Sequence, residues 1–465
     1  METQKRSLEH ENSIKEMEKG HSVFLDGGIG SGISTILNAF LQRTEKKFVQ
    51  LAASDSAAMN TGCSSLYSFF GFCGDVTKEA GEPCFLLDAQ IDLYRSCDGI
   101  IINAIESCRV DYLHAIDRIL REIAEGEDRK KPFGDKQMIF AGDFSRAEPE
   151  IKDKTTYLSL KAMFGGVFAF LAPGWRDGGI RTTTMNQDYI HSNKRDSELL
   201  KRIRKGHYVE HNEVPVDRQK VKAGKCPITE SHSALDEINK KTCSIDSSDL
   251  LIHKTTVLTT NETMSNSLNK LGIMSLSGPE MILPATQTGC FPDRLCPTNR
   301  QLTIKAGMRV ILLTDERHAN GALEHKAASA GTVTGFKEGP TLEVTVELDD
   351  GGIAKVTPKT WEHRAYDLFP DSKGKYVFEE RVVGWFTQLP LIPEYSITID
   401  RAQSLILNKV DIVLGHRYFS SYGAIYSALS CCKDLDNVSI NRPLTPDDIL
   451  VSPEVSRFYG WSKQA

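Results

Sequence analysis

The sequence predicts an α/β protein with two lobes, each built around a parallel sheet, and a small β-barrel inserted in the second lobe. Three observations predict this class. The length of 465 residues exceeds what one hydrophobic core supports. Strand-like apolar runs alternate with helix-patterned stretches early in the chain and again near its end. Between these regions, short β-branched runs are separated by turns, as in an antiparallel barrel.

The expected domains follow from the same changes of pattern along the chain. A polar stretch rich in lysine, serine and aspartate, without a sustained period, separates two α/β regions. The expected boundaries are an N-terminal extension at 1–20, a first lobe at 21–210, a polar connection or insertion at 211–254, the start of the second lobe at 255–301, the barrel at 302–385, and the remainder of the second lobe with a C-terminal tail at 386–465.

The first lobe is expected to begin with a strand, a glycine loop and a helix. His21–Asp26 is a short apolar run that ends in glycines, and Ser34–Gln42 follows with apolar residues at helical spacing. Alternating strands and helices predict a parallel sheet covered on both faces. The other expected elements are strands at Phe48–Ala53, Gly99–Asn103 and Gln137–Ala141 and a helix at Val110–Ala124.

The second lobe shows the same alternation, interrupted by the predicted barrel. Thr256–Thr260 has a strand pattern, and Asn261 is placed to cap a helix that runs to about Leu271. Barrel strands are expected at Arg309–Leu313, Thr332–Phe336 and Leu342–Leu348, and the α/β pattern returns at Val410–Leu414, Gly423–Cys431 and Val438–Ile440.

Composition and charge restrict the function classes. Apolar residues make up 40% and charged residues 25%, as in ordinary globular proteins. A net charge of -6 gives no argument for nucleic-acid binding from overall basicity, so a DNA site would have to be local. One segment gathers basic side chains that could neutralise phosphates or form a solvated helix face. Its members are Lys194, Arg195, Lys201, Arg202, Arg204 and Lys205.

Two further classes of protein do not fit the sequence. The eleven cysteines include no CxxC pair, so we expect no metal site and free thiols in a reducing compartment. No apolar run approaches the ~20 residues that span a bilayer, so we expect no membrane partner.

The glycine loop after the first strand has the spacing of a Walker A phosphate loop. Gly27 and Gly32 are five residues apart, and Gly30 lies between them. Glycines at these places let backbone amides turn toward phosphate, and the following helix adds its positive end. The predicted nucleotide-binding residues are Gly27, Gly30, Gly32, Ser34 and Thr35. Ile33 stands where a Walker loop carries its lysine.

Several segments together resemble the superfamily-one DNA helicases of the Pif and RecD type, from about Val23 to Ile440. Besides the glycine loop, the segments that carry the resemblance are Ala57–Asn60 with Ser65–Phe69, Pro132–Gln137 leading to Gly142–Phe144, Gln388–Leu391 with Ser396–Ser404, and Tyr426–Ser430. The resemblance implies two RecA-like lobes of the P-loop NTPase type, ATP and magnesium as cofactors, and single-stranded DNA as partner.

The resemblance also implies residues that touch the strand. Tyr67 and Phe69 stand in the segment after the second strand, and Thr398 and Gln403 stand in the fifth motif. Aromatic rings can stack on bases without sequence preference. The alternative is that Tyr67 and Phe69 are core residues of the first lobe.

At most positions that the family uses for hydrolysis, this sequence departs from the family's pattern. Asn103 and Ala104 replace the Asp-Glu pair that holds magnesium and orients water, and Glu106 lies two residues further on. Arg146 replaces the glutamine that senses the terminal phosphate, and Cys431 replaces the arginine finger. Together with Ile33, these departures predict no catalytic residue and argue against the use of ATP and magnesium.

The resulting hypothesis is a Pif-type helicase homologue in DNA maintenance, in replication, repair or recombination, with lost or strongly impaired ATPase activity and a role in nucleic-acid binding or scaffolding. We expect an intracellular protein of the mitochondrion or the nucleus, and analogy with family members favours the mitochondrion. Two alternatives stay open: an active ATP-dependent 5′–3′ DNA helicase, and an assembly scaffold that does not bind DNA.

Overall fold

The computed structural model describes residues 8–28, 30–72, 86–149, 151, 153–191, 193–207, 233–244, 255–260, 262–317, 323–337, 339, 341–402, 405–414 and 421–461. The chain divides into two compact units. Unit 1 comprises Met1–Ile190 and Gly272–Pro393, and unit 2 comprises His191–Leu271 and Glu394–Ala465. The antiparallel insertion therefore belongs to the same compact unit as the first lobe, which the sequence did not predict.

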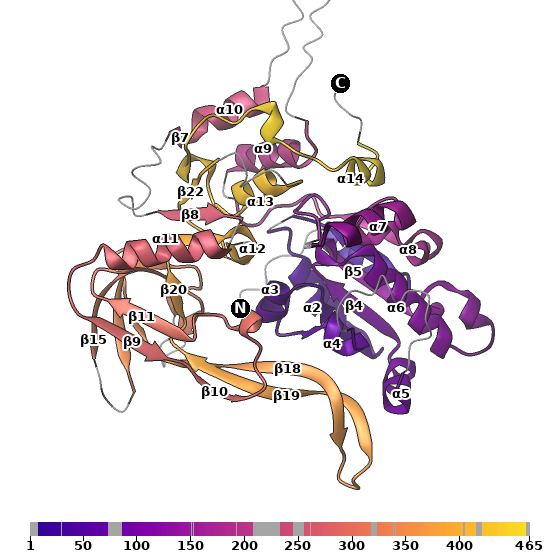
Figure 1. Ribbon diagram of the computed structural model, residues 1–465. Helices are drawn as coiled ribbons and strands as arrows, with labels where there is room; N and C mark the ends of the chain where they lie inside the picture. The colour runs from indigo at the N-terminus through magenta and orange to yellow at the C-terminus, as the bar shows by residue number, and fades with distance from the viewer. Residues whose placement is uncertain are drawn as a thin grey trace, which may run out of the picture. The chain divides into compact units, whose positions relative to one another are not determined.

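A six-stranded parallel sheet forms the centre of the first lobe, as predicted (Figure 1). Its order is β3-β2-β4-β5-β1-β6, and every neighbouring pair is parallel. The bounds are β1 Val23–Asp26, β2 Phe48–Ala52, β3 Ser64–Ser65, β4 Gly99–Asn103, β5 Gln137–Gly142 and β6 Arg181–Thr184. β1 lies beside β5, so the loop after β1 opens at the carboxyl edge of the sheet.

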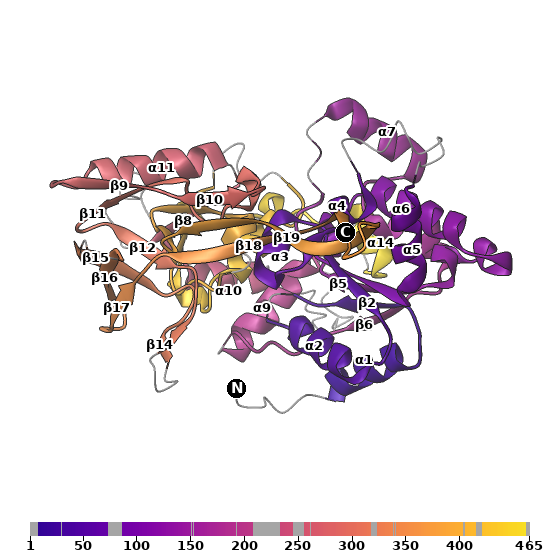
Figure 2. The same ribbon diagram turned by 90° about the horizontal axis from the view of Figure 1, so that it is seen from below.

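In the part of the first lobe that the structure describes, eight α-helices connect these strands or precede them. Their bounds are α1 Leu8–Glu18, α2 Ile33–Arg43, α3 Asp55–Thr61, α4 Leu66–Phe70, α5 Asp88–Ser96, α6 Val110–Ile123, α7 Lys154–Phe164 and α8 Pro173–Asp177. The helix expected at Val110–Ala124 is thus confirmed as α6. α1 lies in the stretch expected to be an extension, yet it packs beside α2 (Figure 2).

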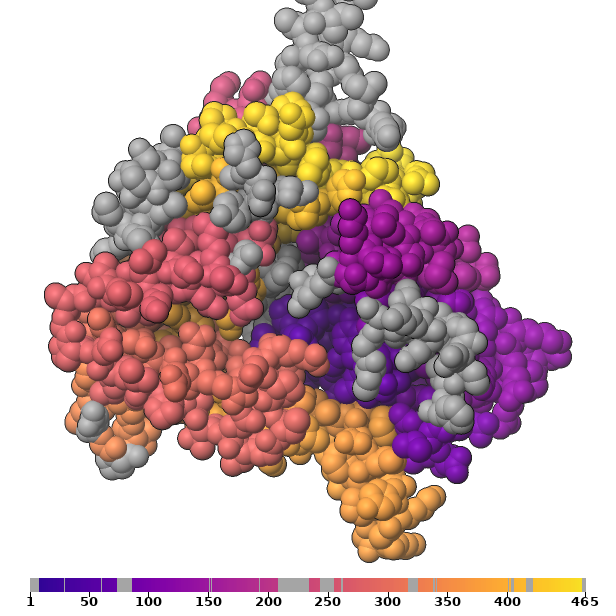
Figure 3. Space-filling model, in the orientation of Figure 1, coloured from indigo at the N-terminus to yellow at the C-terminus, as the bar shows by residue number. Residues whose placement is uncertain are grey.

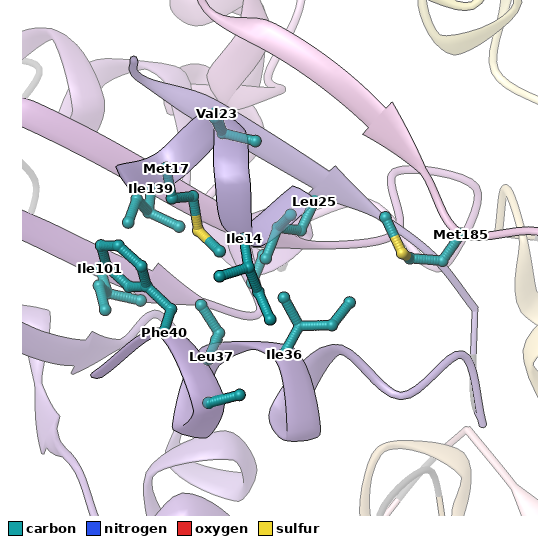
Figure 4. Packing of buried hydrophobic residues seen from close by; sticks show 12 residues of the cluster. Ile14, Met17, Val23, Leu25, Ile36, Leu37, Phe40, Ile101, Ile139 and Met185 are labelled. Atoms are coloured by element: carbon teal, nitrogen blue, oxygen red, sulfur yellow. The ribbon is translucent and has the colours of Figure 1, made fainter. Parts of the chain in front are cut away.

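The core on one face of the first sheet joins α1, β1 and α2 (Figure 4). Val23 and Leu25 point to this face because side chains alternate along a strand. Ile14 and Met17, from α1, are at most 1% exposed and pack with them. The N-terminal sequence did not predict this helix, because the segment is rich in acids, its apolar residues are few and its charged residues face solvent.

The predicted antiparallel insertion is confirmed, and it begins at β9 rather than near residue 302. Its largest sheet has the order β17-β16-β15-β12-β20, and smaller sheets have the orders β10-β19-β18, β11-β9 and β13-β14. The bounds are β9 Glu280–Pro284, β10 Thr286–Gly289, β11 Gln301–Lys305, β12 Arg309–Leu312, β13 Glu316–Arg317, β14 Leu323–His325, β15 Ala330–Lys337, β16 Glu343–Leu348, β17 Ile353–Val356, β18 Lys359–Pro370, β19 Tyr376–Gln388 and β20 Leu391–Pro393.

A long hairpin formed by β18 and β19 leaves the insertion and lies against the first lobe within unit 1. The ring of Tyr366, on β18, packs on Phe69 of α4, with ring centroids 4.7 Å apart. The ring of Phe378, on β19, lies near Tyr94 of α5, with ring centroids 6.3 Å apart. The end of the hairpin projects from the rest of its unit (Figure 3). The hairpin therefore completes part of the aromatic core of the first lobe.

Unit 2 contains a second parallel sheet, with the order β21-β8-β22-β23-β7. Its strands are β7 Cys243–Ser244, β8 Thr256–Thr259, β21 Ser396–Thr398, β22 Val410–Ile412 and β23 Val438–Ile440. The helices of this unit are α9 Lys194–Arg204, α10 Ser233–Lys241, α11 Glu262–Met274, α12 Ile399–Ala402, α13 Ala424–Ser430 and α14 Pro453–Phe458. The last residues of α11 belong to unit 1.

Part of the expected polar connection belongs to this second lobe. α10 packs on α9, and β7 pairs with β23 at the edge of the sheet. The rest of 211–254 and Asn261, the expected helix cap, lie outside the described residues. Among the described residues, no helix is both long enough and apolar enough to cross a membrane.

Candidate nucleotide and nucleic-acid site

The glycine loop makes a tight connection between β1 and α2. Gly30 and Gly32 have φ angles of 80° and 83°, in the left-handed region that favours glycine. The Gly27 amide donates to the carbonyl oxygen of Gly142 on β5, at 3.1 Å. The loop is therefore tied to the neighbouring strand at the carboxyl edge of the sheet.

The start of α2 is suited to an anion. Gly32 is the N-cap residue and provides no side-chain cap. The amides at the start of a helix have no partner within it, and they carry its positive end. The hydroxyl-bearing residues Ser34 and Thr35 are exposed beside these amides. The predicted nucleotide-binding residues thus fit a phosphate group. Ile33 brings no charge, and its aliphatic side chain packs against the core around α1 and α2.

Residues of two segments that are distant in sequence contact the loop. The His10 Nε2 lies 3.2 Å from the Ser31 carbonyl oxygen, and the Tyr189 amide donates to the Gly30 carbonyl oxygen at 2.9 Å. A Cβ atom at Gly32 would lie 2.8 Å from the His10 ring. The two glycines are therefore required for packing as well as for backbone conformation.

The residues at the end of β4 do not fit a magnesium ion. The buried Asn103 donates its side-chain amide to the carbonyl oxygen of Leu51 at 3.1 Å. Ala104 follows in a left-handed conformation with φ 54° and has no ligand atom in its side chain. Among the described residues, no group of three or more His, Cys, Asp or Glu side chains is arranged to hold a metal ion.

Glu106 is the carboxylate next to this position, and it points to the end of β5. It is 4% exposed, its Oε2 accepts from the Asp143 amide at 3.2 Å, and its Oε1 lies 3.4 Å from a guanidinium nitrogen of Arg146. Burial raises the pKa of Glu106, and the charge of Arg146 acts in the opposite direction. Glu106 therefore takes part in an internal ion pair, not in a group of metal ligands.

The Glu106 carboxylate occupies the space where a side chain at position 142 would lie. Substitution of Gly142 therefore tests how the carboxylate packs. A Cβ atom at position 142 would lie 2.0 Å from the Glu106 Oε2. Gly142→Ala is expected to lower the free energy of unfolding by about 1–3 kcal/mol, through overpacking. Chemical denaturation measures the change. Gly335→Ala is the matched control, because a Cβ atom there meets nothing within 4 Å; equal effects of the two variants would contradict the assignment.

The other expected catalytic position is also without charge. Cys431, at the end of α13, is buried and donates its thiol to the Ser427 carbonyl oxygen at 3.1 Å. Burial raises the pKa of the neighbouring Cys432 to about 11, so that thiol is neutral near pH 7. Thr398, at the end of β21, is half-buried, and its Oγ1 lies 3.5 Å from the Arg401 amide. Gln403 lies outside the described residues.

The two aromatic residues predicted to contact DNA differ in exposure. Phe69 is fully buried between Tyr94 and Tyr366, so its ring is not available to a base, and the expectation for this residue is corrected. Tyr67 is half-buried, with its ring edge against Tyr112, and burial raises its pKa. A DNA contact by Tyr67 stays a prediction. Exposure of an aromatic residue depends on which segment covers it, and a local pattern does not contain that information.

The basic segment on α9 makes several contacts within unit 2. Arg195 forms an ion pair with Glu237 on α10. The Arg204 guanidinium lies over the rings of Tyr459 and Trp461, at 5.4 and 5.8 Å. The Arg202 Nε donates to the His207 carbonyl oxygen at 3.2 Å. All three arginines therefore have intramolecular partners, which favours a structural role for them over a dedicated phosphate-binding surface.

Comparison with known proteins finds sequence similarity to helicases of the Pif1 type. The model of the PIF1-like helicase family matches residues 2–166. The ATP-dependent DNA helicase PIF1 of Xenopus laevis is 25% identical over 461 residues, 97% of this chain and 64% of that protein. The Pif1 protein of Bdellovibrio bacteriovorus is 23% identical over 470 residues, 97% of this chain and 91% of that protein. The chain thus spans about 64% of the length of the Xenopus relative.

Solved structures share the fold. A crystal structure of Bacteroides sp Pif1 in complex with ADP-AlF4 has a TM-score of 0.78 and 23% identity, covering 98% of this chain and 96% of that one. Pif1 helicase from Candida albicans has a TM-score of 0.63 and 19% identity, covering 98% and 99%. The order of the motifs, the two parallel-sheet lobes and these relatives lead to one assignment. These findings support a Pif1-type helicase of superfamily one: residues 2–166 match the model of the PIF1-like helicase family, and nearly the whole chain is similar to individual Pif1 helicases.

Proposed function

We propose that this chain is a Pif1-type helicase homologue that binds single-stranded DNA in DNA maintenance and has lost ATP hydrolysis. One observation carries the proposal: the carboxyl edge of the first sheet keeps the phosphate loop but has Asn103 and Ala104 in place of acids, and Glu106 is engaged with Arg146. Hydrolysis needs positive groups that neutralise the phosphates and a group that orients the attacking water. Asn103, Ala104 and Glu106 supply neither.

The role in DNA binding is supported by the family and by the retained strand-facing segments. One structure of a relative is described as Bacteroides Pif1 bound to ssDNA. In this chain, parts of the segment 55–69 contact the insertion of unit 1: Asp55 lies 3.4 Å from Arg294, and Ser64 donates to the Arg364 carbonyl oxygen at 3.2 Å. A substitution in this segment could therefore affect packing as well as DNA binding. Thr398 in unit 2 therefore offers the cleaner test.

The test is binding of a labelled oligothymidylate to the full chain, followed by fluorescence anisotropy at increasing salt. Affinity is expected to fall as salt rises, because phosphate contacts release counterions. Thr398→Ala is expected to weaken binding by about 3- to 10-fold, the loss of one hydrogen bond. The control is Thr387→Ala, on β19, whose hydroxyl meets that of Thr360; its affinity should be unchanged.

The two alternatives make different predictions in the same experiments. Absence of binding at low salt would contradict the proposal and favour an assembly scaffold. Turnover of ATP would favour the active 5′–3′ helicase, which the retained loop glycines and Ser34 support. The compartment, mitochondrion or nucleus with the mitochondrion favoured, is proposed from the family alone.

A further inference from the structure

Carboxylates from β1, from the end of β5 and from the segment after β4 lie at the carboxyl edge of the first sheet. Asp26 ends β1 on the sheet face of Phe24, opposite the face covered by α2, because side chains alternate along the strand. The Asp143 Oδ1 accepts from the Ser145 amide at 2.9 Å. Glu106 accepts from the Asp143 amide and pairs with Arg146.

Arg146 brings a positive charge to this edge. Its amide donates to the Asp143 carbonyl oxygen at 3.1 Å, so the chain turns back after β5. Its guanidinium meets Glu106, the Glu106 carboxylate lies against Gly142, and the Gly142 carbonyl oxygen accepts from Gly27 of the loop. A continuous set of contacts therefore connects the guanidinium to the first glycine of the phosphate loop. The Arg146 side chain is 17% exposed, which leaves part of it accessible.

We infer that the loop binds a nucleoside triphosphate as the metal-free anion, and that Arg146, held by Glu106, supplies the positive charge in place of a divalent ion. The inference rests on the proposed function, in which the loop is kept without its catalytic acids. An arginine is charged at every relevant pH and offers a planar set of donors that suits phosphate oxygens. Glu106 orients this group and also neutralises part of its charge.

The experiment is equilibrium binding of a fluorescent ATP analogue to the full chain, in EDTA and in magnesium, without DNA. The wild-type protein is expected to bind at least as tightly in EDTA as in magnesium, because magnesium complexes the nucleotide and lowers the concentration of the free anion. Arg146→Gln is expected to weaken binding in EDTA by about 10- to 100-fold, the loss of a charge-assisted hydrogen bond. Arg146→Lys, which keeps the charge, should recover part of the loss.

Two further variants separate a role in binding from a role in folding. Glu106→Gln keeps an oxygen that can accept from Arg146 but removes the neutralising charge, so affinity in EDTA should rise, whereas a merely structural pair would make this variant as weak as Arg146→Gln. Arg43→Gln removes one charge at the far end of α2 and should have no effect. Magnesium-dependent binding, or no binding at all, would overturn the inference. DNA binding is measured separately, so magnesium-dependent nucleotide binding or its absence would leave the proposed binding of single-stranded DNA intact.

Discussion

The purified full chain is expected to hydrolyse ATP at least about a thousandfold more slowly than an active Pif1 helicase assayed beside it. Removal of a single arginine finger costs about this factor in related hydrolases. Here Cys431 replaces that arginine, Ile33 replaces the lysine, and Asn103 and Ala104 replace the metal acids. Release of phosphate, with and without single-stranded DNA, measures the rate.

The control for this measurement is Ser34→Ala, because Ser34 is the exposed hydroxyl at the start of α2. Clear turnover that this variant abolishes would come from the protein itself and would contradict the loss of hydrolysis. Ile33→Lys by itself is expected to leave the rate unchanged, because catalytic groups act as a unit and the metal acids are still missing. An appreciable rate in that variant would mean that a functional metal site survives.

Phe69→Ala is expected to lower the free energy of unfolding by about 3–5 kcal/mol, the cost of removing a large buried ring. Phe69 has no exposed surface, and its ring meets Tyr94 at 4.9 Å and Tyr366 at 4.7 Å. The loss would affect both the first lobe and the docking of the β18–β19 hairpin. Urea denaturation followed by tyrosine and tryptophan fluorescence measures it.

An exposed aromatic residue of the same unit provides the comparison for Phe69. Tyr376 is 61% exposed at the start of β19, and Tyr376→Ala should change stability by less than about 0.5 kcal/mol. The conservative variant Phe69→Leu keeps most of the core and tests the discarded role in DNA binding. Weaker binding to oligothymidylate in Phe69→Leu, with stability nearly intact, would restore that role.

Local patterns were sufficient for the parts of the fold that depend on neighbours in the chain. The strand at Val23–Asp26, the glycine loop and the helix from Ile33 form one continuous unit, and glycine spacing and helical periodicity predict it directly. The same holds for α6 and for the antiparallel insertion. The placement of α1, β7 and α10 does not follow from local patterns, because their sequences are short or charged and long-range pairing determines where they belong.

The sequence by itself determined which chemical groups this protein can bring to the phosphate loop. Isoleucine at 33 and asparagine at 103 have no charge wherever they are placed, and cysteine at 431 cannot supply a positive charge, so their identity alone predicts the loss of hydrolysis. Only the tertiary structure decided how the remaining groups are used. Phe69 is buried because a hairpin about 300 residues away covers it, and Glu106 faces Arg146 because β4 and β5 are neighbours. A periodic pattern shows which face of an element is apolar, but burial and ion pairing depend on the segment that lies opposite.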